Sequence, residues 1–320
     1  MNDSARRFEA WWILGVLGIL IALFGVLTPS AFLSLYNAQN VVADASSLLV
    51  LAVGMTFVIA TRGIDLSVGA VLVFAEVAAV KAMIALGGDG TAATVAGVLI
   101  SLGVGGLWGA LNGVAVAYWR IPPMIATLGT LGMAGGGGLL ITNGANVRSG
   151  VPQLLIDGLG SGTVLGVLPA VAVVALAVAL AAGWVLNATR FGLHVLATGS
   201  NEQALSRAGI DVRPIQLRVY VVSGMCAGLA AVIDLARFST TTIGGHTTDN
   251  LDAVTAVVIG GTSLFGGVAT IAGTVIGVFI PAVLADGLVI ANVPSFWQQV
   301  VVGAVLIAAV YADGRRRGRI

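Results

Sequence analysis

Charged side chains are scarce in this sequence of 320 residues, which holds 15 Lys and Arg and 14 Asp and Glu. They make up 9% of the chain, against about a quarter of a typical soluble domain. Hydrophobic residues make up 58%, and the mean hydropathy is +1.03. So few charges cannot cover the surface of a soluble protein of this length. The composition therefore predicts an integral membrane protein that contacts membrane lipid.

Residues that commonly build catalytic and metal sites are scarce too. The chain has one cysteine, Cys226, and two histidines, His194 and His246, which lie far apart in the sequence. A lone cysteine excludes an intramolecular disulfide and a cysteine-based metal cluster. Because no His, Cys or carboxylate set converges, we expect no catalytic residue, no metal site and no enzyme. The net charge of +1 provides no basic surface for a nucleic acid.

Lysine occurs once, as Lys81, and the residue before it is Val80. A phosphate-binding loop of the pattern G-x-x-x-x-G-K-S/T needs glycine at that position. The chain therefore cannot be a P-loop ATPase, and no cofactor is expected to bind to it.

Apolar segments run from Trp11 almost to Ala312 and have the length of membrane helices, which need roughly 20 residues. The sequence predicts an all-α polytopic bundle of about ten helices, some short or broken, in one transmembrane domain over residues 1–320. The expected spans are about Trp11–Leu27, Ser46–Thr61, Leu66–Leu86, Ala92–Tyr118, Pro122–Thr142, Thr163–Leu186, Pro214–Leu235, Leu251–Phe265, Val268–Ala291 and Phe296–Ala312.

Basic residues indicate the orientation, because cytoplasmic loops carry an excess of Lys and Arg. Ten spans with a cytoplasmic N-terminus put both termini and 12 of the 15 basic residues on the cytoplasmic side. These twelve are Arg6, Arg7, Arg62, Arg120, Arg190, Arg207, Arg213, Arg218, Arg315, Arg316, Arg317 and Arg319.

Two glycine-rich joints each connect a pair of apolar runs on the predicted cytoplasmic side. The first contains Arg62, Gly63, Asp65, Ser67 and Gly69, and the second begins at Gly260 and Gly261. Their similarity hints at a duplicated architecture, as in many transporters.

Acidic residues at membrane depth are costly and usually paired. We expect Asp65 to form a salt bridge with Arg62, or else Asp65 or Ser67 to cap the helix that follows. A proton relay is the less favoured alternative. Asp252 is expected to cap a helix that begins near Ala253.

A soluble segment at about 187–213 contains the pattern of a short capped helix. Ser200 is expected to be the N-cap, and Gln203 can close a capping box with it. Glu202 suits the first turn, and Gly209 supplies a left-handed stop. A two-turn helix is too short to be stable alone, so it should dock on its own membrane domain, on a partner, or on both.

Neutral polar residues also occur inside the expected spans, among them Asn112, Thr127 and Thr130. Such groups either join neighbouring helices through hydrogen bonds or line a path for a polar solute. Aromatic residues make up 6% of the chain and cluster near the ends of spans, so any solute contacts should be weak.

Several stretches together resemble one family of transport proteins, in order from about Asn37 to the C-terminus. They are GIDLSVG (Gly63–Gly69), IPPMIATLGT (Ile121–Thr130), ATGSNEQA (Ala197–Ala204) with Ala208–Ile210, LDAVTAVVIGGTSL (Leu251–Leu264) and WQQV (Trp297–Val300). The similarity is to the ribose-type permeases of bacterial ABC importers.

The resemblance implies a multi-pass protein of the bacterial inner membrane that carries a monosaccharide or related polyol. Its implied partners are ABC ATPase subunits that bind ATP and magnesium, a second permease copy or paralogue, and an extracytoplasmic solute-binding protein. The short helix would be the ATPase coupling element, through Ser200, Asn201, Glu202, Leu205, Ala208 and Gly209, with Asn201, Glu202 and Leu205 on its exposed face.

Two other functions stay open. A branched-chain amino-acid ABC permease shares the general plan, although the motifs around Gly63–Gly69 and Leu251–Leu264 argue for sugars. An ion-coupled secondary carrier would need no ATPase. The scattered acidic residues and the capped helix both count against it.

Overall fold

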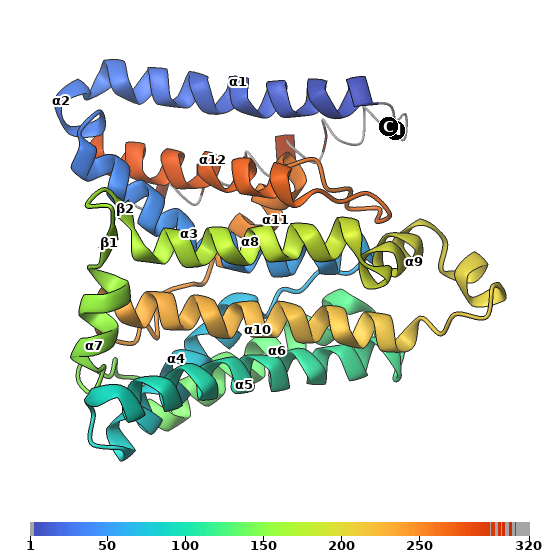
Figure 1. Cartoon of the computed structure of the whole chain (residues 1–320), viewed down its shortest axis with the longest axis horizontal. Helices are drawn as coiled ribbons and strands as arrows, with labels where there is room; N and C mark the ends of the chain where they lie inside the picture. The colour runs from blue at the N-terminus through green and yellow to red at the C-terminus, as the bar shows by residue number, and fades with distance from the viewer. Residues whose placement is uncertain are drawn as a thin grey trace.

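The structure is a computed structural model that describes residues 3–294 and, beyond them, residues 296, 297, 300, 301, 303, 304, 307, 308 and 311. Helices make up most of it, with one two-stranded hairpin (Figure 1). The elements are α1 (Asp3–Leu27), α2 (Pro29–Phe32), α3 (Leu35–Ala60), α4 (Val68–Ala85), α5 (Gly90–Ala117), α6 (Pro123–Thr142), α7 (Gln153–Leu155), a π-turn (Ile156–Gly160), β1 (Thr163–Val164), β2 (Leu168–Pro169), α8 (Ala170–Ala188), α9 (Arg190–Arg207), α10 (Arg213–Phe238), α11 (Asp249–Ile259) and α12 (Ile271–Ile290).

Seven of the described helices are long and apolar enough to cross a membrane: α3, α4, α5, α6, α8, α10 and α12. A shorter apolar stretch, Ile13–Leu27, forms the second half of α1. The prediction of an all-α polytopic membrane protein is therefore confirmed, apart from the hairpin of β1 and β2. The last expected span, Phe296–Ala312, falls partly outside the described residues, and Gln298 and Gln299 are among those not described.

Four expected span boundaries are wrong. Helix α1 begins at Asp3 instead of Trp11. Helix α3 begins at Leu35 instead of Ser46, because the Ser34 side chain accepts a hydrogen bond from the Asn37 N–H and caps an earlier start. Residues 163–169 form the hairpin, so α8 starts at Ala170. Helix α11 stops at Ile259, because Gly261 adopts a φ of 90°, which favours glycine.

Helices α3 and α10 form the centre of the bundle. Most of each helix is buried, and α10 packs extensively against both α3 and α5. The α5–α10 contact depends on a pair of glycines: a Cβ on Gly105 would collide with the Gly224 carbonyl, and the reverse also holds. Membrane helices gain little from apolar burial against each other, so such close backbone packing holds them together.

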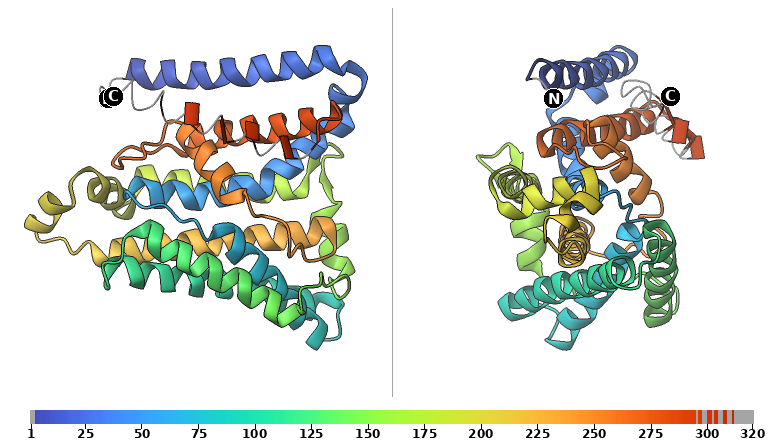
Figure 2. Two further views of the ribbon diagram at one scale, coloured as in Figure 1. Left: turned by 180° about the vertical axis from the view of Figure 1, so that it is seen from behind. Right: turned by 90° about the vertical axis from the view of Figure 1, so that its right-hand side faces the viewer.

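Figures 1 and 2 show α9 at one end of the bundle, with its last turn projecting beyond the other helices. Helix α1 begins at this same end. The non-helical connections from α3 to α4 and from α11 to α12 also approach it.

Candidate functional site

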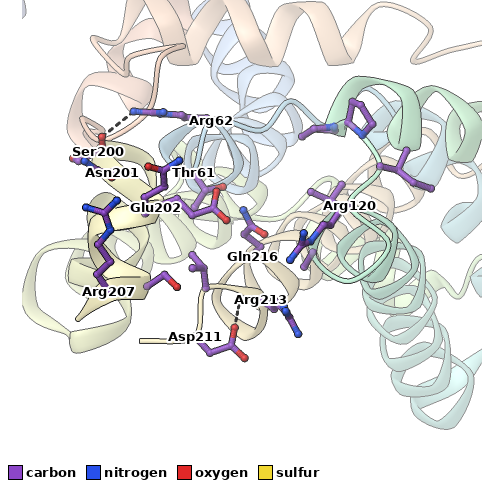
Figure 3. Close-up of a pocket in the computed structure, with 18 residues that line it drawn as sticks. Thr61, Arg62, Arg120, Ser200, Asn201, Glu202, Arg207, Asp211, Arg213 and Gln216 are labelled. Atoms are coloured by element: carbon purple, nitrogen blue, oxygen red, sulfur yellow. Dashed lines mark hydrogen bonds between the residues drawn. The ribbon is translucent and has the colours of Figure 1, made fainter. Parts of the chain in front are cut away.

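A cleft of about 1180 Å³ opens at the end of the bundle where α9 projects (Figure 3). Its walls are the end of α3, the α5–α6 connection, the last turn of α9 and the start of α10. Its charged lining residues are four arginines and two acids: Arg62, Arg120, Arg207, Arg213, Glu202 and Asp211. The cleft is therefore a predominantly basic, open surface.

Helix α9 contains a kink at Asn201, where φ is −159° and ψ is 93°. The Asn201 side-chain oxygen accepts a hydrogen bond from the Ala204 N–H at 2.9 Å. The Ser200 hydroxyl instead donates to the Leu196 carbonyl, in the preceding part of α9, at 3.0 Å. The expected Ser200 cap and its capping box with Gln203 are therefore wrong, because asparagine one residue later takes that place.

The short helix after the kink covers residues 202–207. It ends as expected, since Gly209 has a φ of +81°. Asn201, Glu202 and Ala208 are exposed, whereas Leu205 is half-buried and packs against the main hydrophobic core. Leu205 is thus an anchor to the membrane domain and does not belong to the exposed face. Glu202 remains available to a partner.

Arg62 connects α9 to a distant segment. Its Nε donates to the carbonyls of Gly199 at 2.6 Å and Phe265 at 2.9 Å, and its Nη2 donates to the Ser200 carbonyl at 2.8 Å. The guanidinium thus bonds to the last carbonyls before the kink, where a cation is favoured. The expected Arg62–Asp65 salt bridge is wrong, because Arg62 turns toward these carbonyls.

The two glycine-rich joints meet beside Arg62. The Gly267 N–H donates to the Ala60 carbonyl at 3.0 Å, which ties the joint at 260–270 to the end of α3. A Cβ on Gly199 would collide with both that carbonyl and the Gly267 nitrogen. Three segments far apart in sequence therefore pack backbone to backbone at one point.

Asp65 is buried and holds the start of α4. Its Oδ1 accepts from the Ser67 N–H at 3.0 Å and from the Ser67 hydroxyl at 2.6 Å, and its Oδ2 accepts from the Ser223 hydroxyl at 3.0 Å. The capping alternative is wrong for both residues, because Asp65 bonds to the N-cap residue Ser67 and to no amide of α4, and the Ser67 side chain makes no capping bond. Gly63 is needed nearby, because a Cβ there would lie 2.6 Å from the Tyr220 hydroxyl.

The three neutral polar residues of the expected spans are buried beside Asp65. Asn112 donates to the Ser67 hydroxyl at 2.9 Å and accepts from Thr130 at 2.6 Å. Thr127 donates to the Ile64 carbonyl at 3.2 Å. These are the contacts of the packing alternative, and a part in the solute path stays a prediction.

Asp252 and Gly260 lie at the two ends of α11 and have different surroundings. Helix α11 begins at Asp249, so Asp252 lies inside its first turn and the expected cap is wrong. Gly260 packs on α12, where a Cβ would lie 2.6 Å from the backbone of Gly273.

Sequence reasoning missed several lining residues of the cleft, including Arg120, Asp211 and Gln216. A signal for Arg120 was present, since it belongs to the arginines predicted to share one side of the membrane. Charge segregation names the side, but it cannot say which arginines face one cavity.

A group of possible metal ligands lies away from the cleft. Atoms of Glu76, Asp234 and His246 come within 4.8 Å of one another, so the expectation that no His, Cys or carboxylate set converges is wrong. Each already has a protein partner: Glu76 accepts from Thr242, Asp234 accepts from Ser47, and His246 contacts both Asp249 and Thr242. We assign these side chains to anchoring the connection between α10 and α11.

Comparison with known protein families shows which family the chain belongs to. The family described as "Branched-chain amino acid transport system / permease component" matches residues 37–310. The chain belongs to this permease family. It is therefore a transport subunit rather than an enzyme, and a multi-pass protein of the cytoplasmic membrane.

Curated relatives cover nearly all of the permease. The ribose import permease of Escherichia coli K12 is 39% identical over 98% of both chains. The D-allose transport system permease of the same strain is 36% identical, over 93% of this chain and 89% of the relative. The L-arabinose ABC transporter permease of Azospirillum brasilense is 33% identical, over 99% and 92%. No solved structure matches the permease.

Proposed function

We propose that this permease is the membrane-spanning subunit of an ATP-driven ABC importer that moves a monosaccharide or related polyol. The observation that carries the proposal is full-length similarity to permeases for ribose, allose and arabinose. The basic cleft beside an exposed short helix supports it, because a subunit without its own ATPase needs a docking surface for one.

The coupling surface in this proposal is the end of α9 and the cleft beside it. The residues assigned to the ATPase coupling element are Ser200, Asn201, Glu202, Leu205, Ala208 and Gly209. Among them, Leu205 anchors the short helix to the membrane domain. ATP-driven closure of two ATPases would push the short helix, and Arg62 would carry that movement to both joints. Such a two-state element, biased from one site and read at another, is what coupling requires.

The complete importer would also contain a second permease copy or paralogue and an extracytoplasmic solute-binding protein. ATP and magnesium would bind to the ATPase subunits. With ten spans and both termini in the cytoplasm, the cleft opens toward the ATPases. The four arginines of its lining are all among those predicted to be cytoplasmic.

A branched-chain amino-acid importer is the second candidate, favoured by the family's description. Transport distinguishes the two. The permease is reconstituted in liposomes with its ATPase and binding protein, and ATP hydrolysis is followed with pentoses, hexoses, polyols and branched-chain amino acids. Stimulation by a sugar that needs the binding protein supports the proposal. Stimulation by leucine, or ATP-independent uptake driven by an ion gradient, contradicts it.

A charge reversal at the exposed helix tests the coupling surface in the same liposomes. Glu202→Arg should lower ATP-driven uptake roughly tenfold, because it removes an exposed carboxylate from the contact and reverses the charge that the ATPase surface meets there. Asp157→Arg, the same reversal at an exposed residue far from the cleft, is the control. Equal uptake by both variants would remove Glu202 from the ATPase contact.

A further inference from the structure

The connection between α10 and α11 reaches the middle of the membrane. Helix α11 has 11 residues, a rise of about 16 Å, and ends beside the joint at 260–270. The hydrocarbon core of a bilayer is about 30 Å thick. Asp249 therefore lies near the midplane, and residues 239–248 descend to it from the far end of α10 without forming a helix (Figure 2).

Helix α4 begins at the same depth. The Asn250 side chain donates to the Leu66 carbonyl at 3.2 Å, just before α4 starts. A Cβ on Gly69 would collide with the His246 carbonyl. Two interrupted helices thus start side by side near the midplane, an arrangement that transporters use around their solutes.

Part of the 239–248 connection is bonded to the surrounding protein. The Thr241 N–H donates to the Val147 carbonyl, the Thr242 N–H to Glu76, and the Ile243 N–H to the Asn146 side chain. These bonds fix the first half of the connection against α4 and the α6–α7 loop.

The second half of the connection is different, because Gly244, Gly245 and Thr247 are exposed. Irregular backbone at membrane depth is tolerated where protein buries it or where it lines a water-filled space, since lipid cannot satisfy its polar groups. The exposed surface of residues 244–247 therefore does not face lipid.

A cavity of about 190 Å³ lies against this surface. Helices α4 and α6 supply most of the rest of its lining, with the small residues Gly69, Ala70 and Gly135 beside the apolar Val73 and Leu131. The connection contributes Thr247, and His246, whose Nδ1 lies 2.7 Å from the Asp249 carboxylate. The lining thus presents a hydroxyl and peptide groups beside apolar walls, with its ionisable side chain already paired.

We propose that residues 244–250, together with the small residues of α4 and α6 that face them, form the midplane section of the solute path and contact a neutral polyhydroxyl solute. The proposal rests on the sugar-import function proposed above, and it adds where in the protein the sugar crosses the middle of the membrane. Neutral hydrogen-bonding groups on a largely apolar wall suit a sugar, whereas a charged solute would need an opposite charge there. The buried Asn112, Thr127 and Thr130 then support the path from behind.

Cysteine accessibility tests this location in the assembled importer. Cys226 is first replaced by Ala, which leaves a background free of cysteine. Thr247→Cys reports on the proposed path, Leu180→Cys on an exposed apolar position of α8, and Ser161→Cys on an exposed loop. Each variant is treated during ATP turnover with a water-soluble, membrane-impermeant thiosulfonate, and Ala70→Cys replaces Thr247→Cys if that variant does not assemble.

We expect the Thr247→Cys variant to react within roughly tenfold of the loop control and far faster than the Leu180→Cys variant, because water reaches the path and not the lipid face. The transported sugar should slow its reaction several-fold, and leucine should not. Reaction as slow as at position 180, in a variant that still transports sugar, overturns the path and leaves the sugar function standing. Absence of ATP-driven sugar uptake by the wild-type importer overturns the function itself.

Discussion

The two glycine-rich joints, at 61–67 and 260–270, each end one helix and start another, but different interactions hold them. In the first joint, the buried Asp65 carboxylate bonds to Ser67 and to Ser223 on α10. Side chains therefore determine its shape. One acid fixes both the start of α4 and its distance from α10.

Backbone groups make most of the bonds in the second joint, and the Thr262 and Ser263 hydroxyls also take part, since they accept from the Thr270 and Phe265 N–H groups. The Ser263 N–H donates to the Val268 carbonyl, and the Gly266 N–H donates to the Ser263 carbonyl. Gly266 and Gly267 have φ values of 74° and 80°, in the left-handed region that glycine adopts without strain. A buried polar network and a glycine turn can thus each connect two helices in a defined geometry. Because different interactions hold them, the two joints should respond differently to mutation.

The largest effect is expected where the joints touch α9. Gly199→Ala places a Cβ against the Ala60 carbonyl and the Gly267 nitrogen, neither of which can move independently of its helix or turn. We expect a loss of about 3 kcal/mol in the free energy of unfolding in detergent, the upper end for overpacking. Gly132→Ala, on an open face of α6, is the matched control and should change little.

Asp65→Ala should break the first joint and leave the second intact. Ser67 and Ser223 would lose their shared acceptor in a buried site, which costs about 2 kcal/mol. Asp65→Asn keeps one acceptor oxygen and should cost less. Denaturant unfolding measures both variants, and equal stability of the Ala variant and the wild type would show that the network does not hold the joint.

Arg62→Lys tests the link between the joints. Lysine keeps the charge but loses the planar fork that reaches three carbonyls, so we expect roughly tenfold less sugar transported per ATP hydrolysed, with little change in folding. Arg148→Lys, at an exposed position, is the control. If transport per ATP were unchanged, Arg62 would be a surface contact without a part in coupling.

The smallest effect is expected at the kink of α9. Asn201→Ala removes the cap of the short helix and should cost about 1 kcal/mol locally. Hydrogen exchange of the amides of residues 202–207 measures it. Ser200→Ala should leave that exchange unchanged, and the opposite ranking would restore Ser200 as the cap.

Much of the architecture could be predicted because its signals are local. Long apolar runs identified the membrane helices, and Gly209 marked the end of the short helix. Local patterns failed where two adjacent residues could do the same job, as Ser200 and Asn201 can at one N-cap. They also failed at Leu35–Ala45, where polar residues such as Asn37 concealed the first turns of α3.

Composition and motifs are enough to assign the class of protein, a helical membrane permease without its own phosphate loop, because neither depends on packing. The role of each polar group does depend on packing, and it could not be assigned without the fold. Arg62 bonds to α9 and not to Asp65, and Asn112 bonds to Ser67, because partners 45 and more residues away arrive at the same place. Lipid provides no hydrogen-bond partners for polar groups in the membrane. The position of each charged or amide side chain is therefore set by protein partners that are distant in sequence.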